Sequence, residues 1–129
     1  MSITPVLSDK ACAFPPGLFH HAKVYNGVVY TTGQIGGDVS GKLVSPEVGA
    51  QAEQMFANLS AILEASGSGL DRVLAANIFL TEESNYKAFN EVYTRIMPDP
   101  KPPRTCVFIK SLPADALCEM NLIAAAGTS

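Results

Sequence analysis

The sequence predicts one α+β domain, in which helices cover one face of a β-sheet. Three observations indicate this class: an Asn-Gly pair between two apolar runs, a stretch with apolar residues every three or four positions, and later apolar runs of strand length. The chain has 129 residues, which is enough for one hydrophobic core and short for two domains. We therefore expect a single domain over residues 1–129, with its elements in the order ββ(β)αβαββ.

The first expected element is a β-hairpin. Its strands cover residues 18–24 and 28–35, and Asn26-Gly27 lies at the turn, where both residue types tolerate the backbone angles of a two-residue loop. Glycines at 36, 37 and 41 then mark a turn-rich stretch. We interpret residues 42–44, which follow it, as a short edge-like segment.

The first helix is expected after Ser45, which suits an N-cap, with Pro46 at the first helical position. Ser66-Gly67 supplies its C-terminal stop. Apolar residues spaced three and four apart define its inward face: Val48, Ala52, Met55, Phe56, Leu59, Ile62 and Leu63.

Residues 73–80 are mostly apolar and predict a strand buried on both faces. A second helix is expected over residues 85–97, with Glu82 and Glu83 near its positive end. Its predicted inward stripe consists of Tyr86, Phe89, Asn90, Tyr93, Ile96 and Met97.

Two final strands are expected over residues 105–110 and 117–125, after a connection stiffened by four prolines. Side chains alternate along a strand, so two sets each share a face: Arg104, Cys106 and Phe108 in the first, and Leu117, Glu119 and Asn121 in the second. At about 3.3 Å per residue, the joining segment 111–116 can form a loose hairpin or cross one intervening strand. The sequence leaves both arrangements open.

Composition limits the partners of the chain. Charged residues make up 16% of the sequence and the net charge is −3, so there is no basic excess for a phosphate backbone, and we do not expect nucleic acid as a partner. No run of about 18 apolar residues occurs, and residues 1–16 contain no long apolar core of a signal peptide. We expect a soluble cytoplasmic protein that binds no membrane, with mitochondria as the alternative location.

The cysteines and histidines do not indicate a metal site. Three cysteines without a C-x-x-C pair favour a reducing compartment and predict neither a disulfide framework nor zinc. His20 and His21 are adjacent in an expected strand, so they would point to opposite faces and could not ligate one metal together. Cys106 has no histidine at a recognisable spacing, so we do not expect thiol catalysis.

Arg104 and Glu119 are the strongest candidates for chemistry. Each lies at or within an apolar strand, and an unpaired charge there costs several kcal/mol. Either the two pair with each other, or they meet a ligand, and these readings are equally supported by the residues alone. Arginine suits a small carboxylate, because its planar fork offers two parallel donors.

Other candidate positions have a structural interpretation that is at least as simple. Asn90 on the apolar helix stripe would most simply cap a neighbouring loop. Thr32 and Gly33 end a strand with small residues, which permits close approach of a ligand but is also typical of a bulge or bend. Phe19 would pack, either in the core or against a site.

Several motifs together are characteristic: G-x-F-x-x-A from Gly17, V-Y-T-T-G-Q-I-G from Val29, F-N-x-V-Y from Phe89, P-P-R-T-C-V from Pro102, S-L-P from Ser111, and Glu119 fifteen positions after Arg104. On these motifs the chain resembles the RidA (YjgF) family of enamine/imine deaminases over residues 5–125, and its fungal-type eukaryotic members most of all. Each motif alone is weak, and their combination is specific.

The resemblance implies a chorismate-mutase-like fold, with a mixed sheet and two helices on one face, in a homotrimer with three clefts between subunits. In that fold the last strand lies inside the sheet. It also implies hydrolysis of 2-aminoacrylate, 2-aminocrotonate or their imine tautomers to 2-oxoacids and ammonia. An imine is already electrophilic, so orientation, a carboxylate anchor and one acid/base group suffice, and we expect no cofactor and no metal.

The resemblance also implies roles for individual residues. Arg104 would hold the substrate carboxylate, with the backbone N–H of Cys106 as a further donor, and Glu119 would activate water and move protons at the imine nitrogen. Thr32 and Gly33, with Phe19 from a neighbouring subunit, would close the cleft, and Asn90 would support it.

The chain departs from the family pattern at four positions. Phe19 stands where many relatives carry tyrosine, His20 and His21 replace a small or polar residue and glutamine, and Asn121 replaces a common second acid. Two alternatives stay open: a ribonuclease or translation inhibitor, which would need basic and stacking residues along a groove, and a non-catalytic carboxylate-binding or chaperone-like trimer.

Overall fold

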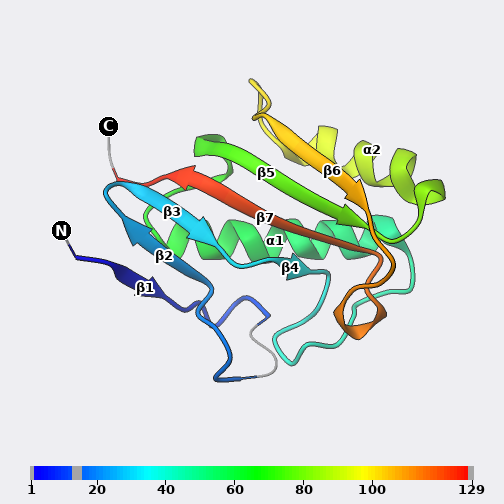
Figure 1. Cartoon of the computed structure of the whole chain (residues 1–129), viewed down its shortest axis with the longest axis horizontal. Coiled ribbons are helices and arrows are strands. Elements are labelled where there is room, and N and C mark those ends of the chain that lie inside the picture. Colours follow the sequence, from blue (N-terminus) through cyan, green and yellow to red (C-terminus); the bar gives the residue numbers. More distant parts are fainter. Residues whose placement is uncertain (1, 13–15, 128–129) are drawn as a thin grey trace.

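The computed structural model describes residues 2–12 and 16–127, which form a mixed sheet with two helices packed on one of its faces (Figure 1). The strands are β1 (Thr4–Val6), β2 (Ala22–Tyr25), β3 (Val28–Thr31), β4 (Gln34–Ile35), β5 (Val73–Leu80), β6 (Arg104–Phe108) and β7 (Cys118–Ala125). The helices are α1 (Val48–Ala65) and α2 (Tyr86–Ile96), with 3₁₀ turns η1 (Leu70–Arg72), η2 (Glu83–Asn85) and η3 (Pro113–Asp115). None of these helices is both long enough and apolar enough to cross a membrane, within the described residues.

The last strand lies in the middle of the sheet. The strand order is β1-β2-β3-β7-β5-β6, and β4 pairs with β7 beyond the end of β3. β7 is antiparallel to both neighbours, whereas β6 runs parallel to β5 at the sheet edge (Figure 1). The segment 111–116 therefore crosses β5, which confirms the crossing arrangement and rules out a hairpin between β6 and β7.

The first hairpin is confirmed, but its strands are shorter than predicted. β2 begins at Ala22 rather than at residue 18, and the strand predicted over residues 28–35 is divided into β3 and β4. Tyr30 lies opposite Ile123 and Gln34 opposite Met120, so the registers on β7 differ by one residue. This is the bulge that the small residues at 32 and 33 suggested.

The amino-terminal half differs from the prediction in two further places. β1 was missed, because three residues that include a proline carry too little pattern to predict a strand. The edge-like segment 42–44 contributes an isolated bridge between Gly37 and Leu43 rather than a strand.

Helix α1 forms the centre of the core, and its predicted inward face is confirmed, because all seven predicted residues are buried. Its start is not as predicted: the helix begins at Val48, and the Ser45 hydroxyl instead accepts the Glu47 N–H at 3.1 Å. Two buried polar residues tie α1 to other elements. Asn58 donates to the Gly37 carbonyl at 2.9 Å, and Gln51 accepts the Leu117 N–H at 2.8 Å, which anchors the loop after β4 and the start of β7.

The prediction that β5 is buried on both faces is wrong. Ala76, Ile78 and Leu80 are buried beneath the helices, whereas Ala75, Asn77 and Phe79 on the other face are only partly buried. The helices cover one face only, so the opposite face of the sheet is open. Tyr30 and Val107 are also exposed there, which leaves apolar surface uncovered in a single chain.

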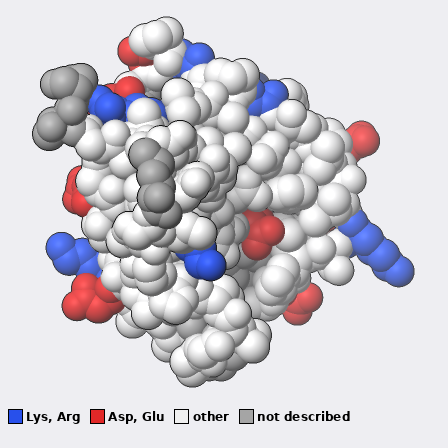
Figure 2. All heavy atoms as spheres, turned by 60° about the vertical axis from the view of Figure 1, so that its left-hand side comes forward, with Lys and Arg blue, Asp and Glu red and all other residues white. Residues whose placement is uncertain are grey.

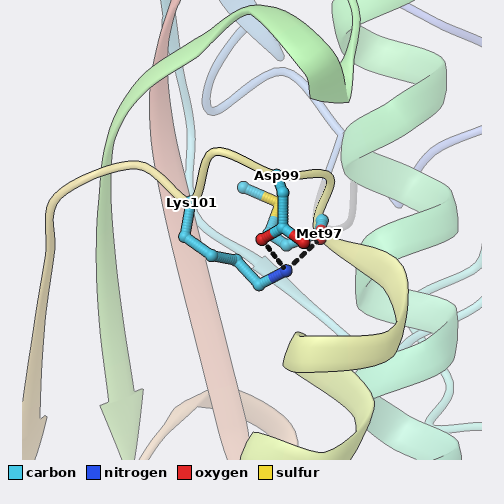
Figure 3. Close-up of polar contacts among 3 residues, drawn as sticks. All are labelled: Met97, Asp99 and Lys101. Atoms are coloured by element: carbon cyan, nitrogen blue, oxygen red, sulfur yellow. Dashed lines mark hydrogen bonds and ion pairs between the residues drawn. The ribbon is translucent and has the colours of Figure 1, made fainter.

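Lys101 stabilises the segment that connects α2 to β6. Its Nζ donates to the Met97 carbonyl at 2.7 Å and to Asp99 Oδ1 at 2.9 Å (Figure 3). The Met97 carbonyl belongs to the end of α2, where carbonyls lack helical partners, so the lysine satisfies one of them. This contact links the chain, three residues before Arg104, to the end of α2.

Replacing Gly36 with alanine is expected to destabilise the fold strongly. A Cβ there would lie 2.2 Å from the Gln51 carbonyl oxygen and 2.4 Å from its Cα, and a helix backbone cannot move aside cheaply. Overpacking of this kind costs about 1–3 kcal/mol or more. Gly49→Ala is the matched control, because its Cβ meets nothing within 4 Å and should stabilise α1 by about 0.5–1 kcal/mol. Urea unfolding at one protein concentration measures both; equal midpoints would contradict the close packing of α1 on β4.

Candidate functional site

Arg104 opens β6 and turns its side chain toward the helices. It lies opposite Ala76 of β5, which is buried on the helix-covered face. Its Nη2 donates to Asn90 Oδ1 at 2.8 Å and to the Tyr86 hydroxyl at 3.3 Å. The guanidinium carbon lies 4.6 Å from the ring centroid of Tyr93. Three residues of α2 therefore hold one arginine head group.

The other terminal nitrogen of Arg104 has no such support. Nη1 is buried and makes no hydrogen bond among the described residues. The ion pairs within the described part of the chain are Arg95–Glu53 and Lys101–Asp99, so Arg104 has no carboxylate partner there. A buried donor without an acceptor is costly, and a ligand oxygen would remove that cost.

The backbone of β6 adds a donor beside this arginine. The Pro103 carbonyl accepts the Ala76 N–H, and the Ile109 N–H donates to the Leu80 carbonyl. In a parallel ladder alternate residues bond to the same neighbour, so the odd-numbered residues of β6 face β5. The N–H of Cys106 therefore faces the free edge of the sheet, next to the Arg104 side chain.

Glu119 lies on the opposite, open face of the sheet. It is opposite Ile35 of β4 and Phe79 of β5, and its side chain lines a cavity of about 300 Å³. Burial raises the pKa of the Glu119 carboxyl above its usual range. The other cavity-lining residues are Cys12, Phe19, Thr32, Gly33, Gln34, Ile35, Phe79, Pro113 and Asn121.

Within one chain, Arg104 and Glu119 do not meet. Arg104 shares its face with Ala76, whereas Glu119 shares its face with Phe79, an odd number of positions along the same strand. The interpretation in which the two form an ion pair in one core is therefore wrong for a single subunit. The sheet separates a cationic half-site at the β6 edge from an acidic half-site on the open face.

The remaining predicted residues divide between these two half-sites. Phe19, Thr32 and Gly33 line the cavity with Glu119, and a Cβ on Gly33 would lie 2.9 Å from the Glu119 carboxyl carbon. Phe19 was expected from a neighbouring subunit relative to Thr32 and Gly33, but it lines the cavity with them from the same chain. Asn90 does not cap a loop; it holds the Arg104 guanidinium.

Cys106 shares the helix-covered face with Arg104, as its position in the strand predicted. Burial raises the pKa of its thiol, and the nearby Arg104 charge offsets this only in part. The thiol is therefore held protonated, which argues against a nucleophilic role. Among the described residues, no group of three or more His, Cys, Asp or Glu side chains is placed to hold a metal ion.

Two contacts of Arg104 were not assigned to the site from the sequence. Tyr86 and Tyr93 were interpreted as core residues of the α2 stripe, yet Tyr86 is exposed and both contact the guanidinium. Residues 86, 90 and 93 recur at four and three positions, so they share one helix face. Two phenols and an amide on an otherwise apolar stripe are the signal that could have identified a site there.

The distribution of charge is uneven on the face seen in Figure 2. Basic and acidic side chains are interspersed around its outline, most of its middle is uncharged, and one acidic group lies in a hollow. The cavity that contains Glu119 is lined by no lysine or arginine. Neither feature is typical of a groove that binds a phosphate backbone.

Fold and geometry define a class of protein: an α+β domain with an unpaired arginine at the sheet edge and a recessed glutamate on the open sheet face. A sequence profile of the endoribonuclease L-PSP family matches residues 12–126. The chain belongs to this family, which is the YjgF/RidA family.

Relatives of known name cover most of the chain. Protein HMF1 of Saccharomyces cerevisiae is 39% identical over 96% of this chain and 95% of its own length. A Schizosaccharomyces pombe protein named mmf1, mitochondrial, is 40% identical over 85% of this chain, which spans 66% of that protein. A protein of Dermatophagoides farinae named 2-iminobutanoate/2-iminopropanoate deaminase is 32% identical over 95% of this chain and 97% of its own length.

Solved structures agree with the fold. The crystal structure of RidA from an Antarctic Psychrobacter bacterium has a TM-score of 0.88 and 34% sequence identity, and the match covers 95% of this chain and 98% of that one. Strand order and helix placement are therefore those of YjgF/RidA proteins.

Proposed function

We propose that this protein hydrolyses reactive 2-imino and 2-enamino acids, such as 2-aminoacrylate and 2-aminocrotonate, to 2-oxoacids and ammonia. The observation that carries the proposal is the buried Nη1 of Arg104, a charged donor without a partner among the described residues. A substrate carboxylate would satisfy it, and the outward N–H of Cys106 would add a second donor. The name of the Dermatophagoides relative agrees with this reaction class.

Glu119 supplies the acid/base group in this proposal. Its raised pKa lets the carboxyl hold a proton closer to neutral pH than an exposed glutamate would. An enamine first becomes the imine by moving a proton from nitrogen to C3. Glu119 donates a proton to the imine nitrogen, and its carboxylate then accepts a proton as water adds to C2. Glu119 passes this proton to the nitrogen of the resulting carbinolamine, the C–N bond breaks and ammonia leaves, and the C2 hydroxyl proton returns to Glu119 as the 2-oxoacid forms. Every step uses water and protons, so no cofactor is required.

A complete site then requires two subunits. Arg104 and Glu119 lie on opposite faces of one sheet, so a single substrate can reach both only where the β6 edge of one chain meets the Glu119 cavity of another. The apolar surface on the open face, including Tyr30 and Val107, would be covered in such an assembly. We propose a homotrimer with three such sites, as the resemblance to the family implies; head-to-tail contacts between subunits are of the kind that can close into a ring.

Two cellular locations are compatible with the sequence and its relatives. We propose the cytoplasm, and the mitochondrion is the alternative that agrees with the printed name of the Schizosaccharomyces relative.

The wild-type protein is expected to accelerate 2-oxoacid and ammonia release from enzymatically generated 2-aminobutenoate or 2-aminopropenoate. Because positioning and general acid/base catalysis act together, the catalysed rate constant should exceed the uncatalysed one by at least about 100-fold under single-turnover conditions. A dehydratase generates the substrate in a coupled assay, and the same assay without this protein gives the background. A rate equal to background, together with retained 2-oxoacid binding, would favour the non-catalytic carboxylate-binding alternative.

A further inference from the structure

The Tyr93 side chain is almost completely buried among described residues. It is 5% exposed, and its ring packs at centroid distances of 6.0 Å on Phe56 of α1 and 6.4 Å on Phe89 of α2. The Arg104 guanidinium carbon lies 4.6 Å from its ring centroid. The ring is thus fixed from behind by the core and presents a face to the arginine.

Of the three α2 residues that contact Arg104, two accept hydrogen bonds from one nitrogen, and the third, Tyr93, lies against the guanidinium with its ring. Asn90 and Tyr86 both accept from Nη2, so they hold one end of the fork. Hydrogen bonds at a single nitrogen leave the plane free to turn about that end. A ring beneath the plane removes this freedom, because a cation is attracted to the negative face of an aromatic ring, and more strongly where water is excluded.

We propose that Tyr93 is a positioning residue that holds the Arg104 guanidinium flat on its ring, so that the Nη1 edge is presented to a carboxylate ligand. This inference rests on the proposed function for the identity of the ligand. The ring fixes the conformation of the Arg104 side chain before the ligand arrives, so ligand binding does not have to order a long flexible side chain. Tyr93 touches the arginine and not the reacting atoms, so it should affect affinity rather than the chemical step.

The ring rather than the hydroxyl carries this role. The Tyr93 hydroxyl is buried and makes no hydrogen bond among the described residues. Burial also raises the pKa of this phenol, so it stays neutral and adds no charge beside Arg104. Phenylalanine at this position would keep the face that the guanidinium contacts.

The test compares Tyr93→Leu with Phe89→Leu. Both remove a buried aromatic ring from α2, but only Tyr93 has the guanidinium on its ring face. Calorimetric binding of 2-oxobutanoate and imine turnover are measured for each. For Tyr93→Leu we expect Kd and KM to rise about 2- to 30-fold, the range from an exposed to a desolvated cation–π contact, with kcat nearly unchanged. Tyr93→Phe should bind 2-oxobutanoate like the wild type.

A fluorinated ring separates electrostatics from packing. Pentafluorophenylalanine at position 93 keeps the shape of phenylalanine but removes the negative ring face, and should weaken 2-oxobutanoate binding relative to Tyr93→Phe. The proposal is overturned if the two bind equally, if Tyr93→Phe loses as much affinity as Tyr93→Leu, or if Phe89→Leu matches Tyr93→Leu. Binding is scored separately from turnover, so a wild type that binds 2-oxobutanoate without hydrolysing imines would refute the proposed function while leaving this inference standing.

Discussion

Replacing Arg104 with alanine is expected to lower kcat/KM for imine hydrolysis by about 100-fold or more, because truncation removes a charged partner from a buried carboxylate contact. Arg104→Lys should recover little of this loss. A lysine ammonium is a point charge, so it cannot donate to Asn90 and Tyr86 from one end, offer a second nitrogen to the ligand and extend over the Tyr93 ring. Steady-state turnover and calorimetric binding of 2-oxobutanoate should fall together, since the arginine acts on the carboxylate of both substrate and product.

Arg95→Ala is the matched control for this prediction. Arg95 lies on α2 like the residues that hold Arg104, but it is exposed and pairs with Glu53. Exposed ion pairs contribute about 0–1 kcal/mol, so its loss should leave turnover unchanged. Normal kcat/KM in Arg104→Ala would show that the carboxylate anchor is elsewhere.

Replacing Glu119 with glutamine is expected to lower kcat by about 100- to 10,000-fold, the usual contribution of a positioned acid or base. Glutamine keeps the shape of the side chain, so 2-oxobutanoate should still bind.

Burial raises the pKa of the Glu119 carboxyl in the folded state, so the folded protein holds this proton to higher pH than the unfolded chain does. The free energy of unfolding should therefore fall as pH rises through the folded-state pKa of Glu119. Glu119→Gln should lose this part of the pH dependence when urea unfolding is measured over the same pH range.

Oligomers that contain both Arg104→Ala and Glu119→Gln subunits test whether the two residues act in the same site. If each site takes Arg104 from one subunit and Glu119 from another, co-refolding equal amounts of Arg104→Ala and Glu119→Gln should restore about a quarter of wild-type activity, because random mixing pairs two intact partners at about that frequency. Each variant refolded alone should stay inactive. A mixture no more active than its components would mean that the two groups do not act across subunits.

Elements with a long repeating pattern were predictable. The inward face of α1 recurs over five turns, and the Asn-Gly turn sets the β2–β3 hairpin, so local signals agree with the fold at both places. β1 is three residues long, and the division of β3 from β4 depends on a one-residue shift against β7. Such features follow from partners distant in the sequence, so local patterns do not predict them.

For the candidate site, the sequence by itself determined which residues could carry the chemistry. Arg104 and Glu119 stand out because a charge within an apolar strand needs a partner, and alternation determined which neighbours share a face with each of them. Only the tertiary structure decided that these two faces are opposite, that Asn90 and Tyr93 hold the arginine, and that Phe19 joins Glu119. Alternation is a property of a single strand, whereas the direction of its faces depends on the register with its neighbours and on the helices that cover the sheet.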